Sequence, residues 1–135
     1  MMPCEITWEP RGLYRKLYGT VSFQEIMASI ESAGADPRFD DLRYSVNDFS
    51  EMQGSEVTFA DVESIAAVLY GQSQTNARIL IAIVTTDETA HALVERLTWL
   101  NIAPYSMQTF PDVAKARAWI AGAMPQTDRS GALQT

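Results

Sequence analysis

The chain contains few of the residues on which disulfide and metal chemistry depend. Its 135 residues include a single cysteine, Cys4, and a single histidine, His91. One cysteine excludes an intrachain disulfide and is typical of a reducing compartment. One cysteine and one histidine are too few for a zinc site, so we expect neither a metal nor a cofactor. The sequence also lacks a charged-then-apolar signal segment and the roughly 20 apolar residues of a membrane span, which favours a cytoplasmic protein with no integral membrane segment.

Positive charge is scarce as well. The net charge is −7, and Lys16 and Lys115 are the only lysines. Proteins that bind the phosphate backbone of nucleic acid need clustered Lys and Arg side chains. The nearest approach to a basic patch is Arg11, Arg15 and Lys16, so we expect no nucleic-acid partner.

Motifs for nucleotide binding and nucleophilic catalysis are missing too. Gly19, Gly34, Gly54 and Gly71 are isolated, so the chain has no glycine-rich phosphate loop. It also has no Gly-x-Ser-x-Gly elbow. A Ser–His or Cys–His pair would have to use His91, which the pattern places on a helix surface. These absences exclude the common catalytic constellations.

The clearest feature that is present is an alternation of strand and helix patterns. Residues 79–84 form an unbroken apolar run bounded by polar residues, which is typical of a strand covered on both faces. Ser22 with Glu25 three residues later forms a capping box for a helix that we expect to end at Gly34. The remaining patterns predict strands at 4–9, 13–18, 44–49 and 105–110 and a polar loop at 50–57. They also predict helices that start at Thr58, at Thr86 or Asp87, and with Pro111 and Asp112, where Pro111 is at or near the first helical position and the helix ends at Ala123.

The predicted order is a hairpin, a helix, and then three strand–helix pairs. Right-handed crossovers place successive strands beside each other in parallel. Only the strand at 79–84 is apolar on both faces, so one side of the sheet is expected to be thinly covered toward the hairpin. We expect one domain over residues 1–123 and a disordered polar tail over residues 124–135.

This pattern resembles the STAS-like, anti-sigma-factor-antagonist (SpoIIAA-like) superfamily, and within it small stand-alone bacterial proteins of unknown function. The resemblance spans roughly residues 4–122. It implies an α/β fold, a STAS/SpoIIAA-like (βα) superhelix with an N-terminal β-hairpin, four βα units and a mixed, mostly parallel five-stranded sheet. The matching pieces are Gly-Thr-Val-Ser at 19–22, Asp-Pro-Arg-Phe at 36–39, Val-Asn-Asp-Phe at 46–49, the run at 78–84 and the segment at 110–120.

The resemblance also implies a non-enzymatic role. Superfamily members bind a protein partner or, in some cases, a small or apolar ligand. Classic members carry a phosphorylatable Ser directly after an Asp at the start of the helix that follows the third strand. Here the Asp–Ser pair is absent: Ser55 and Thr58 are the nearest hydroxyls, Ser50 lies earlier in the same segment, and Glu56 and Asp61 add negative charge. Because a phosphate beside carboxylates is repelled, this departure puts a phosphorylation cycle in doubt.

Strand ends supply the other candidate binding residues. Asp48 lies near the carboxyl end of its predicted strand, where sites gather in open α/β sheets, and Thr85 and Asp87 follow the next strand. Ordinary loop and cap hydrogen bonds account for all three equally well. A receiver domain would need a second acid beside Glu9 and a lysine at the end of the last strand, but Glu9 is a single acid and Phe110 and Pro111 stand in the place of the lysine.

The sequence therefore favours a binding or regulatory module that acts through protein–protein contacts, with a homodimer as one form. Trp99 lies just off the apolar stripe of its helix, which is typical either of an interface or pocket rim or of core or edge packing. A carrier of a lipid or other apolar small molecule is the first alternative. An enzyme with a crevice at Asp48, Thr85 and Asp87 is the second.

Overall fold

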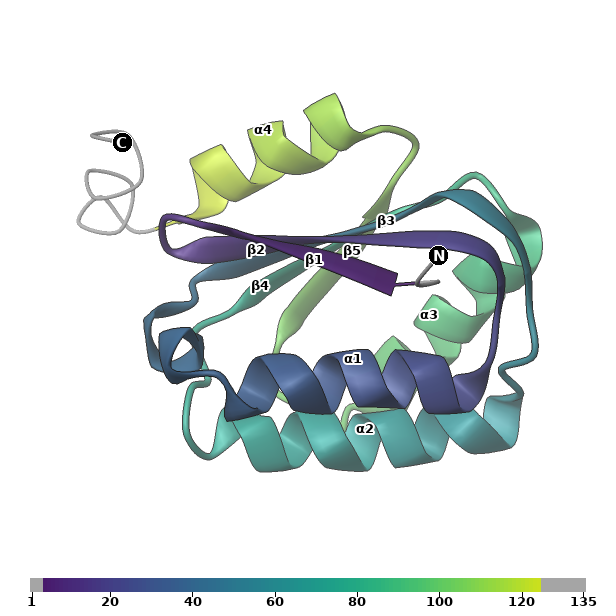
Figure 1. Cartoon of the computed structure of the whole chain (residues 1–135), viewed down its shortest axis with the longest axis horizontal. Coiled ribbons are helices and arrows are strands. Elements are labelled where there is room, and N and C mark those ends of the chain that lie inside the picture. The colour runs from purple at the N-terminus through teal and green to yellow at the C-terminus, as the bar shows by residue number, and fades with distance from the viewer. Residues whose placement is uncertain (1–3, 125–135) are drawn as a thin grey trace.

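The computed structural model describes residues 4–124, which form one five-stranded sheet with helices on both faces (Figure 1). The strand order β1-β2-β3-β4-β5 follows the sequence. Residues 125–135, most of the predicted tail, lie outside the described part. The elements are β1 (Cys4–Glu9), β2 (Gly12–Val21), α1 (Phe23–Ala35), the 3₁₀ helix η1 (Pro37–Asp41), β3 (Tyr44–Ser55), α2 (Phe59–Ser73), β4 (Leu80–Val84), α3 (Glu88–Leu100), β5 (Ser106–Phe110) and α4 (Val113–Ala123).

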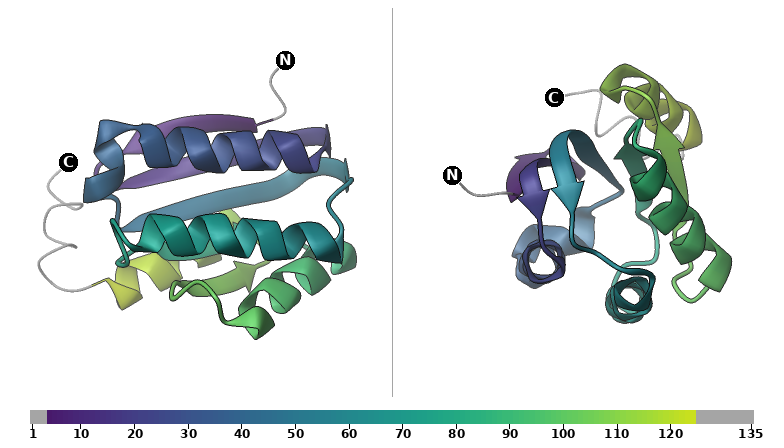
Figure 2. Two further views of the ribbon diagram at one scale, coloured as in Figure 1. Left: turned by 90° about the horizontal axis from the view of Figure 1, so that it is seen from below. Right: turned by 90° about the vertical axis from the view of Figure 1, so that its right-hand side faces the viewer.

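The sheet has the predicted mixed topology. β1 pairs antiparallel with β2, and every later neighbour is parallel. Arg11 closes the hairpin with a left-handed backbone (φ 66°). Figure 2 shows α1 and α2 side by side across one face and α4 on the opposite face. We call the side covered by α1, α2 and α3 the cavity face, and the side covered by α4 the α4 face.

Helix starts follow the predicted chemistry closely. The Ser22 hydroxyl accepts from the backbone N–H of Glu25 at 3.1 Å, and the Glu25 carboxylate accepts from the N–H of Ser22 at 2.8 Å. Thr58 and Asp61 form the same reciprocal box at α2. Such a box satisfies two backbone donors that a helix otherwise leaves free.

One predicted helix boundary, at Gly34, was wrong, and the start of the last helix agrees with the prediction. Gly34 does not end α1: it lies inside the helix, where a Cβ would collide with the Gln72 amide nitrogen, so glycine leaves room for that side chain of α2. Pro111 lies near the first helical position of α4, as predicted: it directly precedes the N-cap Asp112, which accepts from the N–H of Lys115 at 2.8 Å.

The predicted loop at 50–57 was also wrong for most of its length, because β3 continues to Ser55. The extension pairs with the second half of β2, with Tyr18 opposite Glu51 and Val21 opposite Ser55. Both strands therefore project beyond the sheet as a long ribbon. Its polar composition reflects exposure rather than loop structure.

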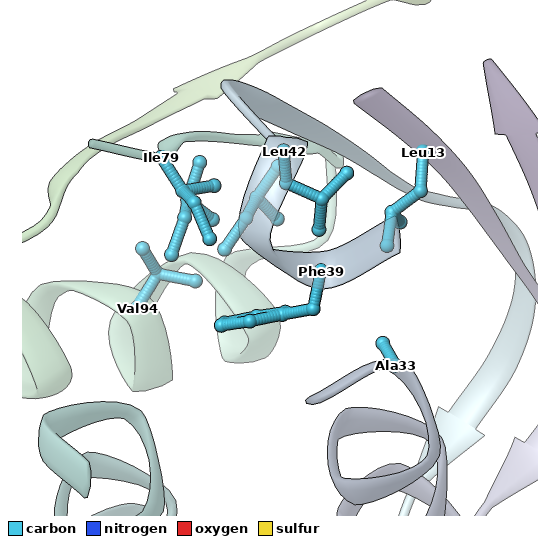
Figure 3. Packing of buried hydrophobic residues seen from close by; sticks show 8 residues of the cluster. Leu13, Ala33, Phe39, Leu42, Ile79 and Val94 are labelled. Atoms are coloured by element: carbon cyan, nitrogen blue, oxygen red, sulfur yellow. The ribbon is translucent and has the colours of Figure 1, made fainter. Parts of the chain in front are cut away.

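The core is divided between the two faces of the sheet. On the cavity face, buried side chains from β2, η1, β4 and α3 pack together, and Figure 3 shows Phe39 lying between the sheet and the helices. On the α4 face, Val46 and Ala82 of the sheet pack against Ala116 and Ile120 of α4. α4 packs on β3, β4 and β5, so the hairpin end of this face is covered least, as the sequence predicts.

Candidate functional site

A cavity of about 160 Å³ lies between the sheet and helices α1, α2 and α3. Most of its lining is apolar. The sheet supplies Leu13, Leu17, Ile81 and Ile83, α1 supplies Ile26 and Ile30, α2 supplies Val62, Ile65 and Leu69, and α3 supplies Ala90, Leu93 and Leu97. An engineered cavity of about 150 Å³ with a similar lining stays dry and binds benzene, so this volume accommodates a small apolar molecule.

One cationic side chain reaches this apolar space. Arg15 points from β2 to the cavity face because it alternates with Leu13 and Leu17, which lie on the same side of the strand. Its Nε donates to Ser29 Oγ on α1 at 2.7 Å, and its Nη1 donates to Asn47 Oδ1 on β3. The guanidinium is thus held by two neutral partners, one from the helix layer and one from the sheet.

Burial disfavours the charged form of the Arg15 guanidinium but does not neutralise it. Desolvation by burial lowers the pKa of Arg15 from 12.5 to about 10, so the guanidinium remains charged at neutral pH. Cys4 also lines the cavity, and burial raises the pKa of its thiol although Arg15 acts in the opposite direction. The thiol is therefore neutral and does not compensate the charge of Arg15.

Asn47 is itself fixed from both sides. Its Nδ2 donates to the Ala82 carbonyl at 3.1 Å and to Ser45 Oγ at 3.2 Å. These bonds leave Oδ1 to face the guanidinium. Arg15, Ser29, Asn47 and Ser45 therefore form a rigid polar cluster in a mostly apolar wall, which is the usual composition of a small-molecule site.

The predicted site residues lie elsewhere and are held by internal hydrogen bonds. Asp48 is buried on the α4 face, where its carboxylate accepts from the Tyr14 hydroxyl and from the N–H of Ser50. Burial acts to raise the pKa of Asp48, but hydrogen bonds from Ser50 and Tyr14 and the charge of Lys16 outweigh it and hold the pKa below its ordinary value. Asp48 is therefore a charged structural acceptor.

The hydroxyls near the start of α2 also have local roles. Ser50 and Ser55 are exposed on the β3 extension, and Ser55 Oγ accepts from the N–H of Val57 at 3.1 Å. Thr58 is the exposed N-cap of α2, and its Oγ1 accepts from the N–H of Asp61 at 3.2 Å. These side chains share one end of the molecule and do not line the cavity, except that Ser55 lies at its border.

The segment after β4 behaves similarly. Thr85 is buried, and its Oγ1 accepts from the N–H of Asp87 at 3.1 Å. Asp87 is the N-cap of α3 and accepts from Ala90 N–H at 2.8 Å.

Trp99, in the last turn of α3, is 72% exposed, with the Arg96 guanidinium 4.7 Å from its ring centroid, so it is not a core residue. His91 is exposed, and its Nδ1 lies 3.3 Å from the carboxylate of Glu95.

Sequence reasoning missed the role of Arg15. It grouped Arg15 with Arg11 and Lys16 as a surface patch, but Arg15 and Lys16 point to opposite faces of β2. The available signal was an arginine placed between two leucines on the apolar side of an alternating strand. Ser29 and Asn47 carried no such signal, because only the fold brings α1 and β3 to the same guanidinium.

Within residues 4–124, no group of three or more His, Cys, Asp or Glu side chains is arranged to hold a metal ion. No helix in this range is long and apolar enough to cross a bilayer.

Solved structures share this architecture, among them the following three. The unphosphorylated anti-sigma factor antagonist SpoIIAA has a TM-score of 0.58 and 5% identity, covering 90% of this chain and 99% of that chain. An uncharacterized DUF3478-family protein with a SpoIIAA-like fold from Shewanella loihica PV-4 has a TM-score of 0.55 and 17% identity, covering 87% and 91%. The phosphorylated form of the Bacillus cell fate determinant SpoIIAA has a TM-score of 0.51 and 11% identity, covering 87% and 98%.

No protein-family model and no curated protein sequence matches the chain. At these identities the structural likeness concerns the fold. The chain has a STAS/SpoIIAA-like fold, which confirms the predicted fold class and resemblance.

Proposed function

We propose that this chain is a non-enzymatic binding module whose ligand occupies the apolar cavity between the sheet and helices α1, α2 and α3. The observation that carries the proposal is the cavity itself, with about 160 Å³ of space and an apolar lining interrupted by one polar cluster. Protein interiors are close-packed, and natural domains contain few voids of this size. A space that persists in a small domain is therefore best explained by something that fills it.

The polar groups that would serve an enzyme are used internally. Asp48, Thr85 and Asp87 each accept a backbone hydrogen bond that holds a strand end or a helix start. This supports the carrier interpretation over a strand-end active site. A SpoIIAA-like fold, whose solved examples include an anti-sigma factor antagonist, is compatible with a regulatory role for ligand binding.

Thermal unfolding with a panel of small apolar ligands tests this function. Octanol, octanoate and octylamine share one chain length, and a ligand at about 100 times its Kd stabilises the folded state by about 2.7 kcal/mol. We expect at least one of them to raise the Tm. Ile65→Trp adds bulk to a side chain that lines the cavity and should abolish the shift, whereas Ala67→Trp places the same ring on the exposed side of α2 and should retain it. No shift with any member would refute the proposal.

A protein partner is the second candidate, favoured by exposed apolar side chains. Trp99, Phe59 and Ile102 are 72%, 57% and 41% exposed, respectively. Large exposed aromatic residues are frequent anchors at interfaces. Sedimentation of the wild type and of Trp99→Ser tests self-association: a dimer that Trp99→Ser converts to monomer supports it, and a wild-type monomer at all concentrations excludes the homodimer.

A further inference from the structure

We infer that the cavity ligand is a monocarboxylic acid with an apolar body, and that Arg15 binds its carboxylate. This inference rests on the cavity function proposed above and names the chemical class of the ligand. Three observations lead to it: the charge of Arg15, the absence of an acidic partner among residues 4–124, and the nature of the space beside it.

The charge of Arg15 has no counter-ion in the described part of the chain. Its contacts there are the Ser29 hydroxyl and the Asn47 amide oxygen, both neutral, and no carboxylate of residues 4–124 pairs with it. Other arginines show the contrast. Arg117 binds Glu9 through both terminal nitrogens at 3.0 and 2.7 Å, and Arg38 binds Asp36 at 2.8 Å. A charge in a poorly solvated site without a partner is costly, so the site favours an anion.

The guanidinium also has hydrogen-bonding capacity to spare. Arginine carries five N–H donors in a planar fork. The two bonds made here use Nε and Nη1, and within residues 4–124 no hydrogen bond is formed by Nη2. A carboxylate accepts from such a fork through two parallel bonds, which gives both strength and orientation. The neutral contacts with Ser29 and Asn47 hold the fork in place without neutralising it.

The remaining lining defines the rest of the ligand. Beyond the polar cluster, the cavity is bordered by aliphatic side chains of α1, α2 and α3, including Ile30, Ile65 and Leu97. These surfaces favour a hydrocarbon chain or ring. A phosphomonoester would bring close to two negative charges to a site with one cation, which disfavours it. An apolar carboxylic acid matches the single charge and the apolar wall together.

Three ligands of equal chain length separate this inference from the cavity function. By titration calorimetry at neutral pH, we expect octanoate to bind at least about tenfold more tightly than octanol, because a hydrogen bond between charged groups is worth more than one to a neutral group. Octylamine should bind most weakly, because it is a cation at neutral pH and is repelled by the charge of Arg15. Octanol binding as well as octanoate would refute the role of Arg15 while leaving the cavity function intact. Failure of all three would refute both.

Variants assign the preference to one side chain. Arg15→Met replaces the guanidinium with an apolar chain and should remove the octanoate preference, so that octanol binds at least as tightly. Arg96→Met makes the same change at a surface arginine of α3 paired with Glu63 at 3.8 Å, and should leave the preference unchanged. An unaltered preference in Arg15→Met would overturn the inference. If Arg15→Met does not fold, the comparison of octanoate with octylamine in the wild type still decides whether the site prefers a negatively or a positively charged ligand.

Discussion

The two faces of the sheet use their polar side chains differently. On the α4 face, Glu9 accepts from Arg117 and from the Tyr44 hydroxyl at 2.6 Å, so that cation and anion are matched between β1 and α4. On the cavity face, Arg15 contacts only neutral groups among residues 4–124. Polar groups that satisfy one another serve the fold. We infer that a cation with no anionic partner among residues 4–124, placed beside an apolar cavity, serves a ligand rather than the fold.

The apolar side chains are also packed more closely on the α4 face than on the cavity face. Ile120 packs in a closed cluster with Val46, Ala82 and Ala116, whereas Ile65 borders the cavity. A side chain next to a void has no neighbouring atoms on one side with which to form dispersion interactions. The α4 face is therefore expected to contribute more stability per buried residue, and the cavity face to accept change more easily.

The largest expected effect tests that packing difference with one substitution made on each face. Ile120→Ala should cost about 3–4 kcal/mol of unfolding free energy, and Ile65→Ala about 2 kcal/mol, because truncation costs more where the side chain is closely packed on all sides. Urea denaturation of both variants measures the difference. Equal costs would mean that the cavity wall is packed as tightly as the α4 core.

The next effect concerns the matched charges of the α4 face. Glu9→Gln should cost about 1–2 kcal/mol, because it weakens a partly buried bidentate pair with Arg117 and removes the charged acceptor of Tyr44. Glu5→Gln is the matched control: Glu5 is exposed and accepts from Tyr18 at 3.3 Å, so its change should stay within about 0.5 kcal/mol. A similar loss in both variants would contradict a special role for Glu9.

Alkaline unfolding compares one phenol from each face. Desolvation and the hydrogen bond to Glu9 raise the pKa of Tyr44 from 10.0 to about 12, and desolvation raises that of Tyr105 to about 12. A raised pKa stabilises the folded state below the unfolded value, and this contribution is lost as the pH rises from 10 towards 12. Tyr44→Phe and Tyr105→Phe should each flatten this decline and cost about 1 kcal/mol at neutral pH. Absorbance titration of the phenols measures the two raised pKa values. Titration of all five tyrosines near pH 10 would contradict them.

The sequence predicted the elements better than the site. Capping at Ser22 and Thr58 and the apolar run of β4 are local signals, so the order of strands and helices follows from nearby residues. The β3 extension was missed because its pairing with Tyr18–Val21 depends on strands brought together by the fold. Asn76 shows the same limit: its side chain donates to the Phe39 and Leu42 carbonyls, at 2.9 Å each, across more than thirty positions of sequence.

Three of the candidate site residues, Asp48, Thr85 and Asp87, were chosen where parallel strands end, which is a rule for open α/β sheets. That rule selected Asp48 and Thr85, whose bonds turn out to be internal. The cavity instead lies along the face of the sheet, where the spacing of α1, α2 and α3 decides how much space remains. No local pattern encodes that spacing. Arg15 was the one residue whose alternation with leucines carried the information.

The smallest expected effect is also the sharpest test of the contrast between the faces. Without ligand, Arg15→Met should change the unfolding free energy by less than about 1 kcal/mol, because relief of a poorly solvated charge offsets removal of the hydrogen bonds to Ser29 and Asn47. Arg117→Met should cost more, since it leaves Glu9 without its cation. Urea denaturation of both variants, with and without octanoate, completes the comparison. A large loss of stability for Arg15→Met alone would mean that its charge serves the fold, as that of Arg117 does.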